Sequence, residues 1–417
     1  MERRVVITGM GLVSALGNDL DTAFNRLHIY KNAICEMENL AAIRGLNSHL
    51  ASPLEFSAPE HFTRKVLRTM GPVSEMAVFS AENALRDAGL LESPEITNGR
   101  TGVAYGSSFG SAGPVADFFS MVKTHEIGNV TSSSYIKIMP QTAAVNISLY
   151  FKTTGRLIPS GTACTSGSLS LGFAYENIKS GAQDIMIAGG AEELDPTQVA
   201  VFDTLYATST KNDTPNKTPS PFDKNRDGLV IGCGAGTLIL EEREHALARG
   251  AKIYAEIVGF GTNTDGTHIT QPNPDTIAHC LELALSSANL KPNDIGYICL
   301  HGTGTTFGDI AESIATNRVF GDHVPASSLK SYVGHTLGAC GALESIWSIQ
   351  MMNNGWFAPT LNLNTVDDKC GALDYITNTG REFNTEFVMN NNFAFGGINT
   401  SLIFKKGGIT NGTFGHL

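Results

Sequence analysis

One cysteine and two histidines stand where chains of alternating strands and helices place reactive side chains. Cys164 follows an extended segment at 157–160 and precedes an apolar run from Leu169 that predicts a helix of about four turns. His301 heads a Gly/Thr-rich loop directly after an apolar strand, and His335 lies just before another predicted helix. Strand-to-helix turns are where α/β folds build their sites, so a thiol and two imidazoles in these settings indicate nucleophilic chemistry.

The neighbourhood of Cys164 favours a reactive thiolate. On the turn into a helix N-terminus, free backbone N–H groups and the positive end of the helix dipole lower the pKa of a thiol. The small residues at 161–163 and 166–167 leave room for a substrate to reach the sulfur. The alternative is a small buried hydrophobic residue, as most free cysteines are. The other six cysteines are scattered without a C-x-x-C pair, so neither a disulfide framework nor a zinc site is indicated and we expect no metal.

Strands and helices alternate along both halves of the chain. In each half a Gly/Thr-rich loop follows a buried strand, which predicts an α/β protein of two similarly built halves, residues 1–250 and 251–406, with a loose tail at 407–417. No sequence repeat is strong enough to prove a duplication. The early Gly9-Met-Gly lacks the third glycine of a dinucleotide-binding fingerprint, because Ser14 stands there, so we predict a strand and turn instead.

Length and charge exclude several classes of protein. A chain of 417 residues is too long for one simple core and suggests two domains or a duplicated one. The net charge of −11, with no stripe of Lys and Arg, argues against nucleic-acid binding. The chain opens with charged residues that run into a strand rather than with a signal peptide, and no apolar segment is long enough to span a bilayer. We therefore expect a soluble, cytoplasmic protein.

Five motifs occur in one order along the chain. They are Gly161-Thr-Ala-Cys164-Thr-Ser-Gly167, Pro221-Phe-Asp-Lys-x-Arg226-Asp-Gly228, His301-Gly-Thr-Gly-Thr305, Lys330-x4-His335-x2-Gly338-Ala339 and Asn392-Phe-Ala-Phe-Gly-Gly397-x-Asn399. Together they resemble the elongating β-ketoacyl-acyl-carrier-protein synthases of type II fatty-acid and polyketide systems, and the resemblance runs from about residue 3 to 406. An accidental match of five motifs in register is very improbable.

The resemblance implies a thiolase-like fold: two similar α/β halves in a five-layered α-β-α-β-α core, normally in a dimer. It also implies roles for this chain's residues. Cys164, in the first half, would take an acyl chain from the phosphopantetheine of an acyl carrier protein, with no other cofactor. The backbone N–H groups of Cys164 and Phe395 would form the oxyanion hole. Malonyl-carrier protein would then lose CO₂, and His301 and His335, both in the second half, would bind the enolate oxygen.

The same resemblance assigns supporting residues. Lys330 and Glu312 match an ion pair that orients the histidine loops, although a Lys or Glu near a loop is more often simply solvated. Phe393 and Phe395 match a pair of gating rings. Phe109 matches the position that bounds the acyl pocket, so we expect some restriction on acyl length.

An acidic carrier protein needs a local basic patch on a chain that is itself acidic. Arg64, Lys65 and Arg68 stand together on a helix predicted within 58–89 and match the family's docking cluster. Three such charges can equally be a solvated helix face.

Three positions depart from the family pattern: Cys233 where Asp or Glu is usual, Ala394 in place of Gly, and Ser220 in place of a common Arg. Because none of them belongs to the Cys-His-His set, they leave the predicted reaction unchanged and bear instead on which substrate is used. They suggest a specialised synthase, such as one that elongates unsaturated or aryl polyene chains.

Other functions are weighed against a condensing enzyme. A non-catalytic chain-length-factor-like subunit of a ketosynthase heterodimer shares the fold but typically lacks the nucleophilic cysteine. A degradative thiolase needs a second catalytic cysteine in the loop at 393–396, which has none, and initiating condensing enzymes carry Asn where His335 stands. A cysteine hydrolase would release free acid without forming a C–C bond. Acyl length, saturation, pathway, and homodimer versus heterodimer stay open.

Overall fold

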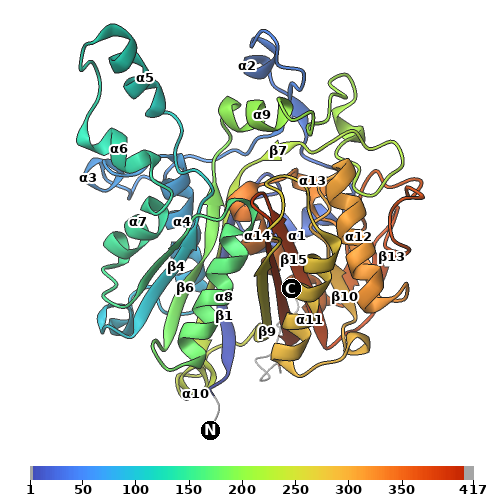
Figure 1. Ribbon diagram of the computed structural model, residues 1–417. Helices are drawn as coiled ribbons and strands as arrows, with labels where there is room; N and C mark the ends of the chain where they lie inside the picture. Colours follow the sequence, from blue (N-terminus) through green and yellow to red (C-terminus); the bar gives the residue numbers. More distant parts are fainter. Residues whose placement is uncertain (1–2, 408–417) are drawn as a thin grey trace.

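Two helices at the centre of the molecule, α8 (Ser166–Lys179) and α14 (Cys340–Asn354), pack against each other and against the sheet on either side of them (Figure 1). The computed structural model describes residues 3–407; the predicted tail at 407–417 lies, except for its first residue, outside this range. Outer helices cover the far faces of the sheet, so the layers run α-β-α-β-α. The expected thiolase-like, five-layered α/β fold is confirmed.

Within the described residues the strands form one large mixed sheet, a small sheet β2-β3-β7 and a pair β12-β14. The large sheet consists of β1 (Val5–Ser14), β4 (Thr101–Gly106), β5 (Leu157–Ser160), β6 (Ile185–Glu192), β8 (Gly234–Glu242), β9 (Ala255–Thr264), β10 (Tyr297–Cys299), β11 (Pro325–Ser327), β13 (Asp374–Tyr375), β15 (Phe387–Ala394) and β16 (Ile398–Lys406). The shorter strands are β2 (Cys35–Glu36), β3 (Leu50–Ser52), β7 (Ile231–Gly232), β12 (Trp356–Phe357) and β14 (Arg381–Glu382).

The strand order shows that the two halves repeat one plan. On one side of the sheet the order is β1-β8-β6-β4-β5, and on the other it is β9-β16-β15-β10-β11-β13. In both, the first two pairings are antiparallel and those that follow are parallel. The halves join where β1 pairs with β9, Val5 opposite Ile257. Equivalent strand ends of the two halves therefore meet in the middle of the molecule.

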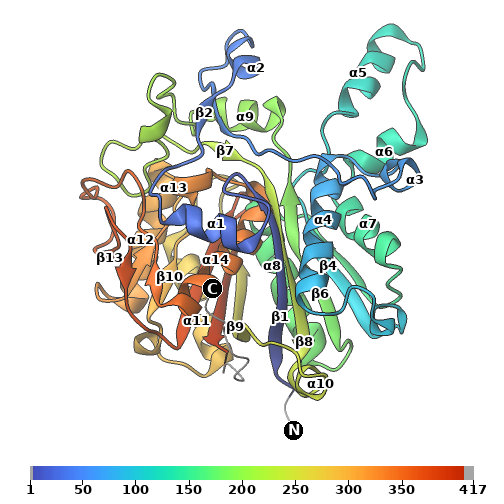
Figure 2. The same cartoon turned by 180° about the vertical axis from the view of Figure 1, so that it is seen from behind.

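The helices follow the same duplicated plan. α4 and α7 cover the sheet of the first half, α11 covers that of the second, and α12 packs against α11. Figures 1 and 2 show α2, α5, α6 and α9 gathered at one end of the molecule, away from the N-terminus. The remaining helices are α1 (Leu20–Leu27), α2 (Glu38–Ala41), α3 (Arg64–Leu67), α4 (Pro72–Asp87), α5 (Val115–Thr124), α6 (Ser132–Ile138), α7 (Thr142–Phe151), α9 (Pro196–Asp203), α10 (Arg243–Ala248), α11 (Pro274–Ala288), α12 (Thr306–Phe320) and α13 (Lys330–Val333).

Small residues let α8 and α14 cross with their backbones nearly in contact. A methyl group on Gly341 of α14 would lie 2.7 Å from the backbone nitrogen of Ser168 in α8. A methyl group on Gly167 of α8 would lie 2.9 Å from the carbonyl oxygen of Gly338, in the turn just before α14. Because real Cβ atoms do not approach so closely, glycine is required at both positions. The crossing brings together the turns that precede the two helices.

The helix predicted within 58–89 is two helices, α3 and α4. Pro72 has no N–H to continue a preceding helix and instead occupies the first turn of α4. Arg64 and Lys65 lie on α3 and Arg68 is its C-terminal cap, so the expected docking residues share one short helix rather than a long one. Among the helices described, none combines the length and the apolar character needed to cross a bilayer.

We expect Gly341→Ala to lower the free energy of unfolding by about 1–3 kcal/mol, because the added methyl forces the two central helices apart. Urea denaturation would measure the change. Gly113→Ala is the matched control, since a methyl there meets no atom within 4 Å, and it should change stability very little. A Gly341→Ala protein as stable as the control would contradict the close crossing.

Candidate active site

Cys164 lies on a single tight turn between a strand and a helix. This turn, η2 (Ala163–Thr165), follows β5 and leads directly into α8. Ala163 has a φ of 49°, a left-handed conformation that a residue with a side chain rarely adopts. The turn places the thiol in the interior, where Cys164 is 5% exposed. The predicted position of Cys164 at the entrance to a helix is confirmed.

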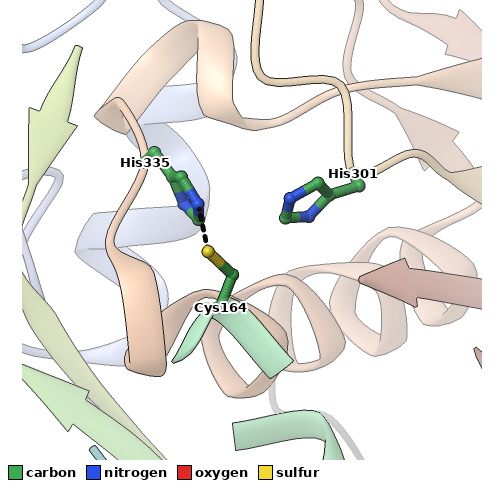
Figure 3. Close-up of side chains that lie close together, drawn as sticks. All are labelled: Cys164, His301 and His335. Carbon is green, nitrogen blue, oxygen red and sulfur yellow. Dashed lines mark hydrogen bonds between the residues drawn. The ribbon is translucent and has the colours of Figure 1, made fainter. Parts of the chain in front are cut away.

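The two histidines meet the thiol from the other half of the molecule (Figure 3). His301 follows β10, and His335 lies between α13 and the turn η5 (Leu337–Ala339) that opens α14. The Nε2 atom of His335 is 2.9 Å from Sγ of Cys164. One ring nitrogen from each histidine and Sγ all lie within 4.8 Å of one another, and the two rings are nearly perpendicular, at 88°. All three residues are buried.

Hydrogen bonds on the far sides of the rings determine which nitrogen carries the proton. The backbone N–H of Leu337 donates to Nδ1 of His335 at 3.3 Å. The side-chain amide of Asn392 donates to Nδ1 of His301 at 3.4 Å. A neutral imidazole that accepts at Nδ1 carries its proton on Nε2. Both histidines therefore present an Nε2–H donor.

Both imidazoles are neutral at physiological pH. Burial lowers the pKa of His301 and of His335 well below 6.5, and the positive charge of Lys330 lowers both further. A metal-binding histidine offers a lone pair and donates its other N–H, which is the reverse of this arrangement. The three side chains are thus arranged to donate hydrogen bonds to a ligand atom rather than to hold a cation.

The thiol of Cys164 is protonated at rest, contrary to the expectation from its helix position. Burial raises the pKa of Cys164 to about 12, outweighing the charge of Lys330, which lowers it. The helix N-terminus therefore does not produce a standing thiolate, because desolvation of the charged sulfur is the larger effect. The backbone N–H groups of Cys164 and Phe395 both hydrogen-bond the sulfur when it is charged.

The expected ion pair of Lys330 with Glu312 is wrong: Lys330 pairs with Glu344. Nζ of Lys330, which is 1% exposed, lies 2.5 Å from Oε1 of Glu344 on α14. Burial favours the neutral amine, but the carboxylate of Glu344 prevails and raises the pKa of Lys330. Glu312 instead accepts the backbone N–H groups of His301 and Gly302, at 2.6 and 2.7 Å. Glu312 therefore fixes the backbone of the His301 loop, whereas Glu344 binds Lys330.

Glu344 and Asn392 are functional residues that the sequence analysis missed. The second carboxylate oxygen of Glu344 accepts the side-chain N–H of Asn392 at 2.7 Å, and Asn392 is the residue that orients His301. Both stood out in the sequence: Glu344 is an acid inside a largely apolar helix, and Asn392 lies in a buried strand. Buried polar residues in such elements need partners, and that was the usable signal.

A cavity of about 270 Å³ leads to the three residues. Phe393 and Phe395 line it, and the ring of Phe393 is 6.0 Å from that of His301. Their gating role stays a prediction. Phe109 is not among the lining residues and is 42% exposed. Its predicted limit on acyl length therefore stays a prediction. Cys233, one of the three departures, is buried and directs its Sγ at the carbonyl oxygen of Ser52.

We expect the alkylation rate of Cys164 by iodoacetamide to rise about tenfold per pH unit from pH 6 to 9 without a plateau. The reactive thiolate is a small fraction over this whole range because the pKa is about 12. Peptide mass spectrometry would follow the adduct, with glutathione in the same solution levelling off near its own pKa, about 8.5. A plateau at Cys164 below pH 8 would show that the helix N-terminus outweighs burial.

We expect Lys330→Met to lower the free energy of unfolding by about 3–5 kcal/mol, because it leaves the carboxylate of Glu344 buried without a counter-charge. Combining it with Glu344→Leu should recover most of this loss. Urea denaturation of both proteins would test the pairing. If the double variant is the less stable of the two, Glu344 does not depend on Lys330.

Comparisons with known proteins agree with this geometry. The model of the β-ketoacyl synthase N-terminal domain matches residues 2–246, and that of the C-terminal domain matches residues 254–364. The 3-oxoacyl-(acyl-carrier-protein) synthase 1 of Haemophilus influenzae is 38% identical over 407 residues, which are 97% of this chain and 99% of that protein.

Solved structures match over the full fold. A β-ketoacyl synthase from Burkholderia phymatum superimposes with a TM-score of 0.96 at 56% identity, covering 97% of this chain and 99% of its own. The ishigamide ketosynthase/chain length factor gives 0.90 at 31%, covering 98% and 100%. A type II polyketide ketosynthase in complex with its acyl carrier protein gives 0.86 at 30%, again covering 98% and 100%. The chain belongs to the β-ketoacyl synthase family.

Proposed function

We propose that this protein is an active β-ketoacyl-acyl-carrier-protein synthase, an acyltransferase that lengthens an acyl chain by two carbons. One observation carries the proposal: a buried thiol lies beside two neutral imidazoles, each with a ring nitrogen within 4.8 Å of the sulfur and each with its proton on Nε2. The alternative, a non-catalytic chain-length-factor-like subunit, is not favoured. Such a subunit needs neither the nucleophile nor the donors, and this chain has both in place.

In the first half-reaction the sulfur of Cys164 attacks the thioester carbonyl of an acyl chain carried on phosphopantetheine. Negative charge develops on the carbonyl oxygen, and the backbone N–H groups of Cys164 and Phe395 are the donors for it. The C–S bond to phosphopantetheine breaks, and the proton of the Cys164 thiol ends on the released phosphopantetheine sulfur. Because this thiol is protonated at rest, proton transfer accompanies the attack rather than preceding it.

In the second half-reaction malonyl-carrier protein loses CO₂, and the electron pair of the broken C–C bond forms an enolate. Its oxygen is bound by the Nε2–H groups of His301 and His335. Neutral donors suit this step, because an acidic imidazolium would protonate the carbanion. Burial, and after it the charge of Lys330, lowers the pKa of both histidines and keeps the rings neutral. The carbanion then attacks the acyl carbonyl, a C–C bond forms, and the sulfur of Cys164 leaves as a thiolate. This thiolate takes up a proton from water and so restores the resting thiol.

The partners are an acyl carrier protein and a second subunit. Arg64, Lys65 and Arg68 are exposed on and beside α3 and offer positive charge to an acidic carrier. The surface that binds the second subunit consists of α5, α6 and β5, and β5 is an edge strand of the large sheet. Large apolar side chains stand out there, including Phe119, 74% exposed, and Tyr135, 63% exposed. Such a patch suits a subunit interface.

We expect Cys164→Ala to abolish the acyl-enzyme, whereas His301→Ala and His335→Ala retain it and lose condensation by about 100-fold or more, because each removes one donor to the enolate. Mass spectrometry of the protein after incubation with acyl-carrier protein, and of the products after malonyl-carrier protein is added, separates the two steps. A panel of saturated, unsaturated and aryl polyene chains would assign the acyl class.

Two results would contradict the proposal. Release of free acid without a new C–C bond would make the protein a hydrolase. Absence of any adduct on Cys164 with every member of the panel would favour a non-catalytic subunit.

A further inference from the structure

Four large apolar side chains are exposed to solvent although they line the cavity that leads to Cys164. They come from three separate segments: the end of the turn after α9, the loop between β9 and α11, and the first turn of α12. We call them the mouth collar; they are Leu205, Tyr206, Ile269 and Phe307, with exposed fractions of 46%, 88%, 68% and 68%. Apolar side chains that converge in this way on one opening are typical of a binding surface.

The backbone holds one of these rings in solvent at an energetic cost. Tyr206 has a φ of 53°, a left-handed conformation unfavourable for an aromatic residue. Its turn is fixed by Asp203, which is 4% exposed and accepts the backbone N–H groups of Asn47 at 2.9 Å and Ser48 at 3.1 Å. Asp203 also accepts the hydroxyl of Thr208 at 2.8 Å. Strain that is stabilised by a buried carboxylate and directs a ring outward indicates a functional contact.

We propose that the mouth collar is an apolar docking surface for the carrier protein, which it contacts while the phosphopantetheine arm enters the cavity. This inference rests on the proposed function. A partner that stayed on the collar, such as a second copy of the chain, would close the route to Cys164. The occupant must therefore be transient and must itself bring the reacting group. An acyl carrier protein meets both conditions, and a related ketosynthase has been solved with one bound.

The charges around the cavity agree with an apolar rather than an ionic contact. Its described lining includes the acids Asp227 and Asp265 and no Lys or Arg, so an acidic carrier gains no attraction there. The basic residues of α3 lie in another part of the molecule: Figure 1 shows α3 at the left and α12, which carries Phe307, at the right. Recognition is thus divided between a basic patch that attracts the carrier and an apolar collar that seats it.

The test compares two acyl donors on one set of variants. Acylation of Cys164 is measured by quenched-flow mass spectrometry, with octanoyl groups on a bacterial type II acyl carrier protein and on free pantetheine. For Tyr206→Ser combined with Phe307→Ser, kcat/KM should fall about tenfold more with the carrier-bound donor than with the pantetheine donor. Ile29→Ser, at a similarly exposed apolar residue (64%) outside the cavity lining, is the matched control and should lose nothing with either donor.

The salt dependence of acylation distinguishes the contribution of the mouth collar from that of the basic residues on α3, because screening weakens ionic contacts and leaves apolar ones intact. The collar effect should persist in about 0.5 M NaCl, where the effect of Arg64→Ala fades. Equal losses with both donors, no loss with either, or a wild-type enzyme that uses pantetheine as well as carrier would each overturn the docking surface. A wild-type protein acylated by neither donor would overturn the proposed function instead.

Discussion

The buried ion pair between Lys330 and Glu344 is the interaction on which the site depends. It places a full positive charge, 1% exposed, beside the reactive thiol and the two imidazoles. Glu344 accepts a hydrogen bond from Asn392, which in turn donates to the ring of His301. Lys330 itself belongs to the segment that ends at His335. Its charge adds to the effect of burial, which keeps both imidazoles deprotonated, so they donate hydrogen bonds without being acidic. A buried ion pair adds little net stability, but the charge of this one lowers the pKa of the thiol and of both imidazoles, in addition to what burial does to each.

Duplication of one plan explains why the reacting groups come from both halves. In the first half β5 leads through a tight turn into α8, and in the second half β11 leads through α13 and the turn η5 into α14. The two central helices cross at glycines. The crossing brings the turn before α8, with Cys164, against the turn before α14, with His335. His301 comes from the strand end next to it. The relative positions of the nucleophile and its hydrogen-bond donors therefore depend on the close packing of the two central helices.

Particular residues show how far sequence reasoning reached. The positions of Cys164, His301 and His335 at strand-to-helix turns, and the five-layered fold, were predicted from local pattern and from the order of the motifs. The partner of Lys330 was not, because Glu312 and Glu344 are both acids near the histidine loops and sequence spacing does not distinguish them. The helix break at Pro72 was overlooked because apolar spacing continued across it. A first-turn proline begins a helix as readily as it ends one.

The amino-acid sequence by itself determined which groups can react, which turns present them and which family plan the chain follows, because these depend on residue type and short-range spacing. Only the tertiary structure decided the protonation of those groups. The pKa of Cys164 is raised to about 12 and those of both histidines are lowered well below 6.5 by burial among residues distant in the chain. Desolvation depends on everything that surrounds a group, and the surroundings exist only once the two halves have packed together.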